Sequence, residues 1–295
     1  MIRYSIAICT YNRADLLNST LSSLSKVAGV DAPDVEVVVV DNNSTDQTPQ
    51  TLATFTNCLP LTVVSEPQQG HCFARNRAVA AANGAVLLWT DDDVQFESRW
   101  LAAYRQVVDD DSVRSFWGGP IEPKFLAKPP RWIEENWGQL AGCFAARDLG
   151  PTPLVLDAKH LPYGANFAVR RDLCLQFPFN TQLGRHGTNV VGEDERDFLL
   201  RLLRAGHVGV WVPEAKLQHL IPPHRATLAY IRQYFAGQAR VQAYFDQQPK
   251  FTSRELTQAV RHHWLRWHWS RWVSKSSVWL EHWIKLAMFE EWKRG

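Results

Sequence analysis

Several features that would settle the class of protein at once are absent from this sequence. Its five cysteines are scattered and contain no CxxC pair, so neither a disulfide framework nor a zinc site is expected. No stretch approaches ~18 uncharged apolar residues, so we expect no membrane-spanning helix. The formal net charge of +2 gives no electrostatic case for a nucleic-acid partner. Reduced thiols predict a cytoplasmic location.

Internal repeats, low-complexity tracts and a leader-like start are also missing. The opening "MIRYSIAICTYNR" becomes polar too early for the apolar core of a secretory signal. The 295 residues, 45% apolar and 21% charged, are typical of a globular protein that buries a full core. Only the thirteen tryptophans are unusual, and seven of them fall between Trp264 and Trp292.

The first hundred residues alternate between strand and helix patterns. Short apolar runs typical of buried strands cover 4–9, 35–40, 61–65 and 85–90. Helical patterns between them predict a parallel sheet covered by helices. Ligands bind beyond the carboxyl ends of such strands, where this chain places "CTYNR", "VDNNS" and "WTDDD". We therefore expect these three polar stretches to converge on one site.

Three consecutive aspartates, Asp91 to Asp93, end the fourth of these runs. Side chains alternate along a strand, so Asp91 and Asp93 face one way and Asp92 the other. Two carboxylates at one strand tip repel each other unless a proton or a cation separates them. Mg²⁺ and Mn²⁺ prefer hard oxygen ligands such as carboxylates and phosphates. The stretch indicates either a metal-bound diphosphate or a solvated acidic turn.

The second half of the chain is less regular. Residues 117–219 are rich in Pro, Gly and Trp, but "GEDERDFLLRLLRAG" predicts a clear helix that ends at Gly206. Two strand-like runs, "HVGVWV" and "AKLQHL", follow it. An amphipathic helical pattern then covers 228–245, and the Trp-rich tail begins near Ser253.

Five stretches, in their order and approximate spacing, resemble the family 2 glycosyltransferases of the GT-A fold. They are "SIAICTYNR", "VVVVDNNSTDQT", "GHCFARNRAVAAANG", "LLWTDDDV" and "GEDERDFLLRLLRAG". The resemblance implies an α/β fold with a Rossmann-like, mostly parallel central sheet flanked by helices, and a C-terminal helical extension. It places a GT-A domain at 1–225, with a nucleotide-binding half at 1–116 and an acceptor and catalytic half at 117–225. Residues 226–295 would form the helical region with the basic, Trp-rich tail.

The resemblance also implies roles at the strand ends. Thr10 and Tyr11 would line the nucleotide-base pocket, and Asp41 would accept the N3–H of uracil or thymine, as an ionised carboxylate can. Arg75 would lie near the diphosphate, whose geometry suits a guanidinium. Asp41 could instead be a turn residue, and Arg75 a surface charge. The remaining donor contacts implied are Asn12, Arg13, Asp91, Asp92 and Asn166.

The resemblance further implies a metal and a base. Mn²⁺ or Mg²⁺ would bind Asp91 and Asp93, with His219 completing its shell, although a structural role for this histidine is equally open. Asp194, in an "ED" pair at a helix start, would take the acceptor hydroxyl's proton during an inverting transfer, with Glu193 placing the acceptor or the base. Acids at this position could also simply complement the helix dipole.

The expected activity is transfer of a sugar from a UDP- or dTDP-sugar to a glycan or lipid-linked acceptor. "DDDV" also fits the nucleophile motif of haloacid-dehalogenase-type phosphatases, but that motif opens the phosphatase fold, whereas here three strands precede it. A non-catalytic sugar-nucleotide-binding protein is the other alternative.

The tail has a charge pattern of its own. Residues 254–295 hold eight Lys/Arg against four Asp/Glu, a net charge of +4. Basic residues beside indoles are typical of a helix at a membrane interface, which predicts a peripheral protein on the inner face of the membrane. Packing on the catalytic domain, or on a second subunit of a homodimer, is equally open because Trp is also a good core residue. Five tryptophans fall near one helical stripe: Trp264, Trp267, Trp272, Trp279 and Trp283.

Overall fold

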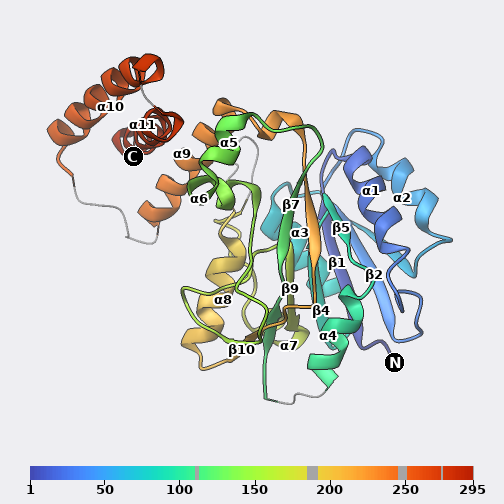
Figure 1. The fold of residues 1–295 in the computed structure, drawn as a ribbon. Coiled ribbons are helices and arrows are strands. Elements are labelled where there is room, and N and C mark those ends of the chain that lie inside the picture. Colours follow the sequence, from blue (N-terminus) through green and yellow to red (C-terminus); the bar gives the residue numbers. More distant parts are fainter. Residues whose placement is uncertain (110–112, 185–191, 245–250, 274, 295) are drawn as a thin grey trace. The chain divides into compact units, whose positions relative to one another are not determined.

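A computed structural model describes the chain except for residues 110–112, 185–191, 245–250, 274 and 295 (Figure 1). The described residues form two compact units. The first contains most of the chain up to residue 220, and the second contains 125–144 together with the residues from 221 onward. Residues 125–144 thus belong with the C-terminal helices, which the expected division at 225 did not anticipate.

The first unit is built on an eight-stranded sheet of order β3-β2-β1-β4-β9-β6-β10-β8. Its first four strands are parallel: β1 (Tyr4–Thr10), β2 (Val35–Asp41), β3 (Leu61–Ser65) and β4 (Val86–Asp91). The others are β6 (Phe116–Gly118), β8 (Val155–Leu156), β9 (Asn166–Arg170) and β10 (Gly209–Trp211). Only β9 and β8 run antiparallel to their neighbours. The mostly parallel central sheet is therefore confirmed.

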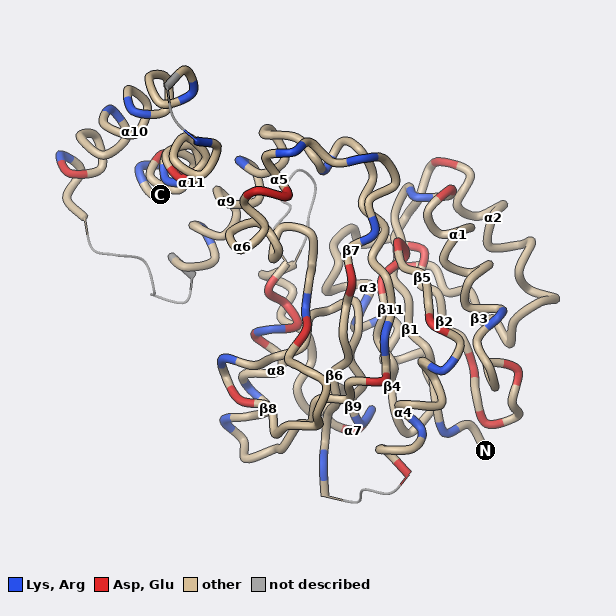
Figure 2. Tube along the Cα trace, in the orientation of Figure 1, with Lys and Arg blue, Asp and Glu red and all other residues tan. Residues whose placement is uncertain are grey.

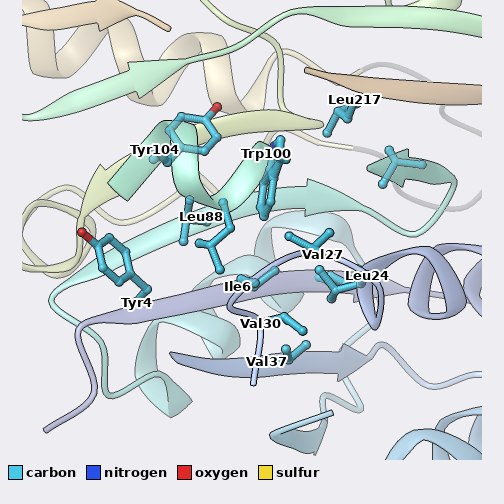
Figure 3. Packing of buried hydrophobic residues seen from close by; sticks show 14 of the residues in the cluster. Tyr4, Ile6, Leu24, Val27, Val30, Val37, Leu88, Trp100, Tyr104 and Leu217 are labelled. Atoms are coloured by element: carbon cyan, nitrogen blue, oxygen red, sulfur yellow. The ribbon is translucent and has the colours of Figure 1, made fainter. Parts of the chain in front are cut away.

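Both faces of this sheet are covered because its strands are apolar on both sides. Tyr4, Ile6 and Ile8 of β1 join one hydrophobic cluster, while Ala7 joins the other. Figure 3 shows the first cluster, in which Trp100 and Tyr104 lie over the strands. The first cluster takes its helical residues from α1 (Ala14–Leu24), α2 (Thr48–Phe55) and α4 (Trp100–Asp109). The second takes them from α3 (His71–Ala81), α7 (Arg171–Gln176) and α8 (Asp194–Arg204).

A smaller sheet lies beside the aspartate stretch. Its order is β5-β11-β7, with β5 at Val94–Phe96, β7 at Ile121–Phe125 and β11 at Leu217–Ile221. Strand β11 runs antiparallel to β5 and sets His219 opposite Val94, one residue after Asp93. A histidine distant in sequence thus reaches the acidic strand end.

The second unit is helical. Its elements are α5 (Arg131–Glu135), α6 (Trp137–Leu140), η1 (Ala141–Phe144), η2 (Pro223–Arg225), α9 (Leu228–Tyr244), α10 (Ser253–Val273) and α11 (Ser276–Arg294). Residues such as Ile133, Ile231 and Leu280 form its hydrophobic core. Among the described helices, none is long and apolar enough to cross a bilayer.

Most of the predicted tryptophan stripe is used for packing inside this second unit. Trp267 of α10 stacks on Trp283 of α11 with ring centroids 4.4 Å apart. Trp279 meets Trp132 of α5 edge to face, at 6.0 Å. These residues therefore pack within the helical unit, whereas Trp264 and Trp272 of the stripe are 49% and 81% exposed.

Candidate active site

The carboxyl ends of the parallel strands are level with one another. In the register of the sheet, Thr10 lies opposite Asp41 and Cys9 lies opposite Asp91. The polar stretches that follow these three strands therefore gather at one edge of the sheet, as the alternating pattern predicted. In sheets of this kind that edge is where ligands bind.

A single arginine holds the aspartate stretch together. The Arg13 guanidinium lies at the start of α1, with Nη1 2.9 Å from Asp92 Oδ1 and 2.7 Å from Asp93 Oδ2. Thr10 Oγ1 also donates to Asp92 at 2.7 Å. Asp92 and Asp93 are only 5% and 1% exposed, so the solvated acidic turn is excluded. The cation that separates these carboxylates in the structure is Arg13.

The pKa values of this cluster follow from its burial and charges. Asp92, and then Asp93, raise the pKa of Arg13 above its usual value, so this guanidinium stays charged. Burial raises the pKa of Asp92, because the opposing effects of Arg13 and Thr10 do not fully offset it. His219 completes the cluster, with Nε2 3.3 Å from Asp93 Oδ1.

The loops after β1 and β2 are tied together by polar side chains. Asn12, at a left-handed φ of 50°, accepts the backbone N–H of Thr45 at 2.7 Å. Asp41 Oδ1 accepts the backbone N–H of Ser44 at 3.0 Å. Both residues therefore shape the loops at the ligand edge, and Tyr11, which precedes Asn12, is exposed. The turn role considered for Asp41 is therefore present.

A second charged cluster surrounds Asp194, the first residue of α8. Its Oδ2 lies 3.4 Å from Arg75 Nε and 3.3 Å from His71 Nδ1, both on α3. Glu193, before it, has a left-handed φ of 69°, a conformation that non-glycine residues rarely adopt and that often marks functional sites. Burial would raise the pKa of Asp194, but Arg75 and then His71 hold it well below its usual range. Asp194 is therefore ionised.

Arg75 is buried, so its interpretation as a surface charge is wrong. Its guanidinium lies over the rings of Trp89, Phe167 and Phe179, at 5.0 to 5.6 Å from their centroids. Nη2 donates to the carbonyl of Gly164 at 3.4 Å, and a Cβ at Gly164 would come within 2.6 Å of it. Nη1 has no hydrogen-bond partner among the described residues. Arg75 thus fixes the start of α8 against α3.

Comparison with known proteins decides the family. A family model of glycosyl transferase family 2 matches residues 5–170, more than half of the chain. The chain belongs to glycosyl transferase family 2. It is 22% identical over 246 residues to the glucosyl-dolichyl phosphate glucuronosyltransferase of Haloferax volcanii, covering 81% of this chain and 76% of that protein. It is 26% identical over 244 residues to the succinoglycan biosynthesis protein ExoM of Rhizobium meliloti, covering 80% and 74%.

Solved structures share the fold. A mannosyltransferase from Pyrobaculum calidifontis, in complex with GDP-Man and Mn²⁺, aligns with a TM-score of 0.60 at 20% identity, over 99% of this chain and 83% of that one. A fragment of S. aureus TarS aligns with a TM-score of 0.55 at 16% identity, over 99% and 89%. At these identities the likeness shows the fold alone, and it confirms the GT-A architecture of this glycosyltransferase.

The donor set of this glycosyltransferase fits a divalent cation in part. Asp93 and His219 supply a carboxylate and an imidazole close together, and Asp91 lies two residues earlier on the same strand end. Within the described residues, no three His, Cys, Asp or Glu side chains are grouped to hold a metal. Mg²⁺ and similar ions at phosphate sites commonly take only one or two carboxylates and complete their shell with substrate oxygens.

Asn166 requires a correction. The resemblance placed it at the donor, but its side chain is fully buried and its amide is satisfied by the scaffold. Its Oδ1 accepts from Trp100 and Tyr104, both at 2.9 Å. Its Nδ2 donates to the carbonyls of Pro120 and Ala215. These four bonds use the full capacity of an asparagine amide, so Asn166 joins β9 to its neighbours rather than contacting a ligand.

Sequence reasoning missed two members of this family 2 site. His71 lies in the quoted "GHCFARNRAVAAANG" stretch, but nothing in the sequence places it beside Asp194. Glu195 is the third acid of "GEDERD" and lies near Gly164 and Arg75. Burial, and then Asp194, raise the pKa of Glu195 to about 8, so it holds a proton where Asp194 does not. Their opposite shifts are typical of paired groups with different roles.

Proposed function

We propose that this protein is an inverting glycosyltransferase that moves a sugar from a nucleotide-diphosphate sugar to a hydroxyl of a glycan or lipid-linked acceptor. The observation that supports this most strongly is the meeting of the two charged clusters at one strand end. Arg75, whose Nε lies 3.4 Å from Asp194 Oδ2, also lies over the ring of Trp89, two residues before Asp91 on β4. The arginine beside the base candidate therefore packs on the strand that ends in the aspartates.

The donor would occupy the edge formed by β1, β2 and β4. Thr10, Tyr11 and Asp41 would meet the base and ribose, and UDP and dTDP present the same N3–H to Asp41. Asp91 and Asp93, with His219, would hold Mn²⁺ or Mg²⁺, which when bound neutralises charge on the diphosphate. The mannosyltransferase neighbour was solved with GDP-Man and Mn²⁺, so a guanine nucleotide must also be tested.

Asp194 would act as the general base. The acceptor hydroxyl gives its proton to this ionised carboxylate while its oxygen forms a bond to the anomeric carbon. The bond from that carbon to the diphosphate oxygen breaks, and the nucleoside diphosphate leaves with the electron pair. Arg75 and His71 would position the carboxylate, and Glu193 would lie beside the acceptor. A lipid-linked acceptor fits the name of the Haloferax volcanii relative, a glucosyl-dolichyl phosphate glucuronosyltransferase.

Of the two alternative functions, the fold excludes one and leaves the other to be tested. A haloacid-dehalogenase-type phosphatase is excluded by the GT-A fold and the family, and β4 lies fourth among the strands along the chain. A non-catalytic sugar-nucleotide-binding protein shares the fold and needs an experiment. An ionised, positioned Asp194 favours the enzyme, because binding alone gives no reason to bury a carboxylate beside Arg75 and His71.

The decisive experiment combines binding and turnover. UDP, dTDP and GDP are titrated by calorimetry in Mn²⁺ and in EDTA, and the nucleotide that binds then selects the donor sugars to assay. Asp194→Asn should lower turnover by about 10²- to 10⁴-fold with nucleotide binding unchanged. Asp197→Asn is the matched control, since Asp197 lies on the same helix and pairs with Arg201 at 2.9 Å. Turnover of Asp194→Asn at the wild-type rate would remove the base assignment, and no nucleotide binding at all would remove the function.

A further inference from the structure

One face of α10 is apolar, aromatic and exposed. Helix α10 packs on α11 through residues that include His263 and Trp267. Opposite this contact lie Leu265, Trp269 and Trp272, which are 51%, 60% and 81% exposed. Their spacing of four and three residues places them on one side of the helix. Such large exposed side chains, gathered on one stripe, mark an interaction surface.

Basic residues frame this stripe. Arg261 precedes Leu265 by one helical turn on the same side, while Arg266 and Arg271 lie on its two flanks. Arg271 also lies over the Trp272 ring, at 5.7 Å from its centroid. Figure 2 shows basic positions along α10, and Glu255 at its start is the only acid of the helix. The exposed face is therefore uniformly basic around an indole stripe.

The chemistry of this face matches a bilayer surface better than a protein partner. Indoles are favoured at the headgroup level, where the ring is apolar and the N–H stays hydrated. Arginines at the flanks reach outward to phosphates, with their stems lying along apolar surface. A second copy of this helix would bring basic faces together, with no acid among the described residues of either stripe to offset the repulsion. Charge complementarity thus favours an anionic lipid surface.

We propose that this face of α10, comprising Arg261, Leu265, Arg266, Trp269 and Trp272, is a docking surface for membranes that contain anionic phospholipid. The helix lies in the plane of the interface, since none of the described helices is suited to cross it. The tryptophans of α11 take no part, because they pack inside the second unit. Docking here is independent of the sugar chemistry proposed above.

The test is flotation of the full chain with vesicles of phosphatidylcholine containing about 30% phosphatidylglycerol, compared with phosphatidylcholine alone. Wild type should float with the anionic vesicles, and less so as salt is raised. Trp269→Ser with Trp272→Ser should lower the partition coefficient at least about tenfold at every salt concentration. Leu175→Ser with Val155→Ser is the control, since it removes two exposed apolar side chains from the first unit.

The charge contribution is tested separately. Arg261→Gln with Arg266→Gln should weaken binding by about fivefold for each charge removed, and only at low salt. Arg99→Gln with Arg204→Gln removes the same charge from exposed positions elsewhere and should leave binding nearly unchanged. Circular dichroism confirms that each variant folds. The proposal is overturned if wild type does not float, if controls and variants lose binding equally, or if the indole variant instead converts a dimer to a monomer in sedimentation.

Discussion

At the scale of single residues, Arg13 explains how three consecutive aspartates coexist at a strand end. Its Nη1 is shared between Asp92 and Asp93, both almost fully buried. The same Asp93 carboxylate is the one proposed to meet a divalent cation. Arg13 and the metal would therefore share Asp93 as a partner. The stronger the interaction of Arg13 with Asp93, the less favourable the free energy of binding the cation would be.

This sharing predicts that Arg13→Gln destabilises the protein and makes it more dependent on metal. Removing one partner of a buried pair costs about 3 kcal/mol, because the carboxylates lose their cation. Mn²⁺ should then raise the melting temperature of Arg13→Gln more than that of wild type. Arg3→Gln, which removes a more exposed ion pair with Asp109, is the control and should show the wild-type response. An equal Mn²⁺ effect in all three proteins would contradict the shared site.

Residue-scale patterns in the sequence predicted the types of group at the site better than their partners. Asp91 to Asp93 and Asp194 are found at strand and helix ends because chain order and periodicity fix those positions. The pairing of Arg13 with Asp93, or of His71 with Asp194, depends on how loops and helices meet in space. Asn166 was misassigned for the same reason, since only the tertiary structure reveals its four scaffold bonds.

At the scale of elements, α10 and α11 meet through a histidine pair. His263 Nδ1 lies 2.9 Å from His282 Nδ1, so at least one ring must be neutral to accept this bond. Burial, and then His282 and His262, lower the pKa of His263 to about 4, with Lys285 adding to the effect and Glu281 opposing it. The folded protein therefore favours the neutral form of this histidine pair.

This pair predicts that the contact between α10 and α11 weakens in mild acid. The pKa of His263 is lower in the folded than in the unfolded chain, so its stabilising effect is present above about pH 6.5 and is lost as pH falls toward 4. His263→Phe keeps the ring stacked near Phe289 but cannot titrate. Its melting temperature should fall less than that of wild type between pH 6.5 and 4.5, by on the order of 2 °C. His160→Gln, at an exposed site, is the control, and identical pH profiles for His263→Phe and wild type would refute the idea.

The same helices show why the tail could not be assigned from sequence alone. A tryptophan stripe serves equally for packing and for an interface, because indole burial is favourable in both. Trp279 and Trp283 of α11 pack against α5 and α10, while the opposite face of α10 stays exposed. The sequence also gave no sign that residues 125–144 join this helical unit, since Pro and Trp there fit several environments.

At the scale of the whole molecule, the sheet was predictable because its strands are apolar on both faces and follow one another with short connections. The five ordered stretches predicted the GT-A fold. In the structure, the strand register places the carboxyl ends of β1, β2 and β4 side by side. The residues between β6 and β9 were not predictable in detail, because their strands are short and β8 pairs antiparallel with the distant β10. The strand ends of the site could thus be predicted from the sequence, whereas the positions of the helices around them could be learned only from the structure.

Asp194 and Glu195 make the free energy of unfolding depend on pH, in opposite directions. The folded pKa of Asp194 is depressed, so its contribution is complete at neutral pH and is lost only in acid. The folded pKa of Glu195 is about 8, above the value near 4.5 that it has when unfolded. Between these values the folded chain holds the proton more tightly, so stability falls as pH rises from about 4.5 to 8.

Glu195→Gln should remove this part of the pH dependence. Between pH 5 and 8 its melting temperature should decline less than that of wild type, by about 2–4 °C for each kcal/mol involved. Glu214→Gln, which alters an exposed acid of the first unit, is the control, and it should keep the wild-type slope with at most a small offset. Differential scanning calorimetry across this range measures both. If Glu195→Gln follows the wild-type slope, Glu195 is ionised at neutral pH, and the pair beside Arg75 consists of two carboxylates rather than one carboxylate and one acid.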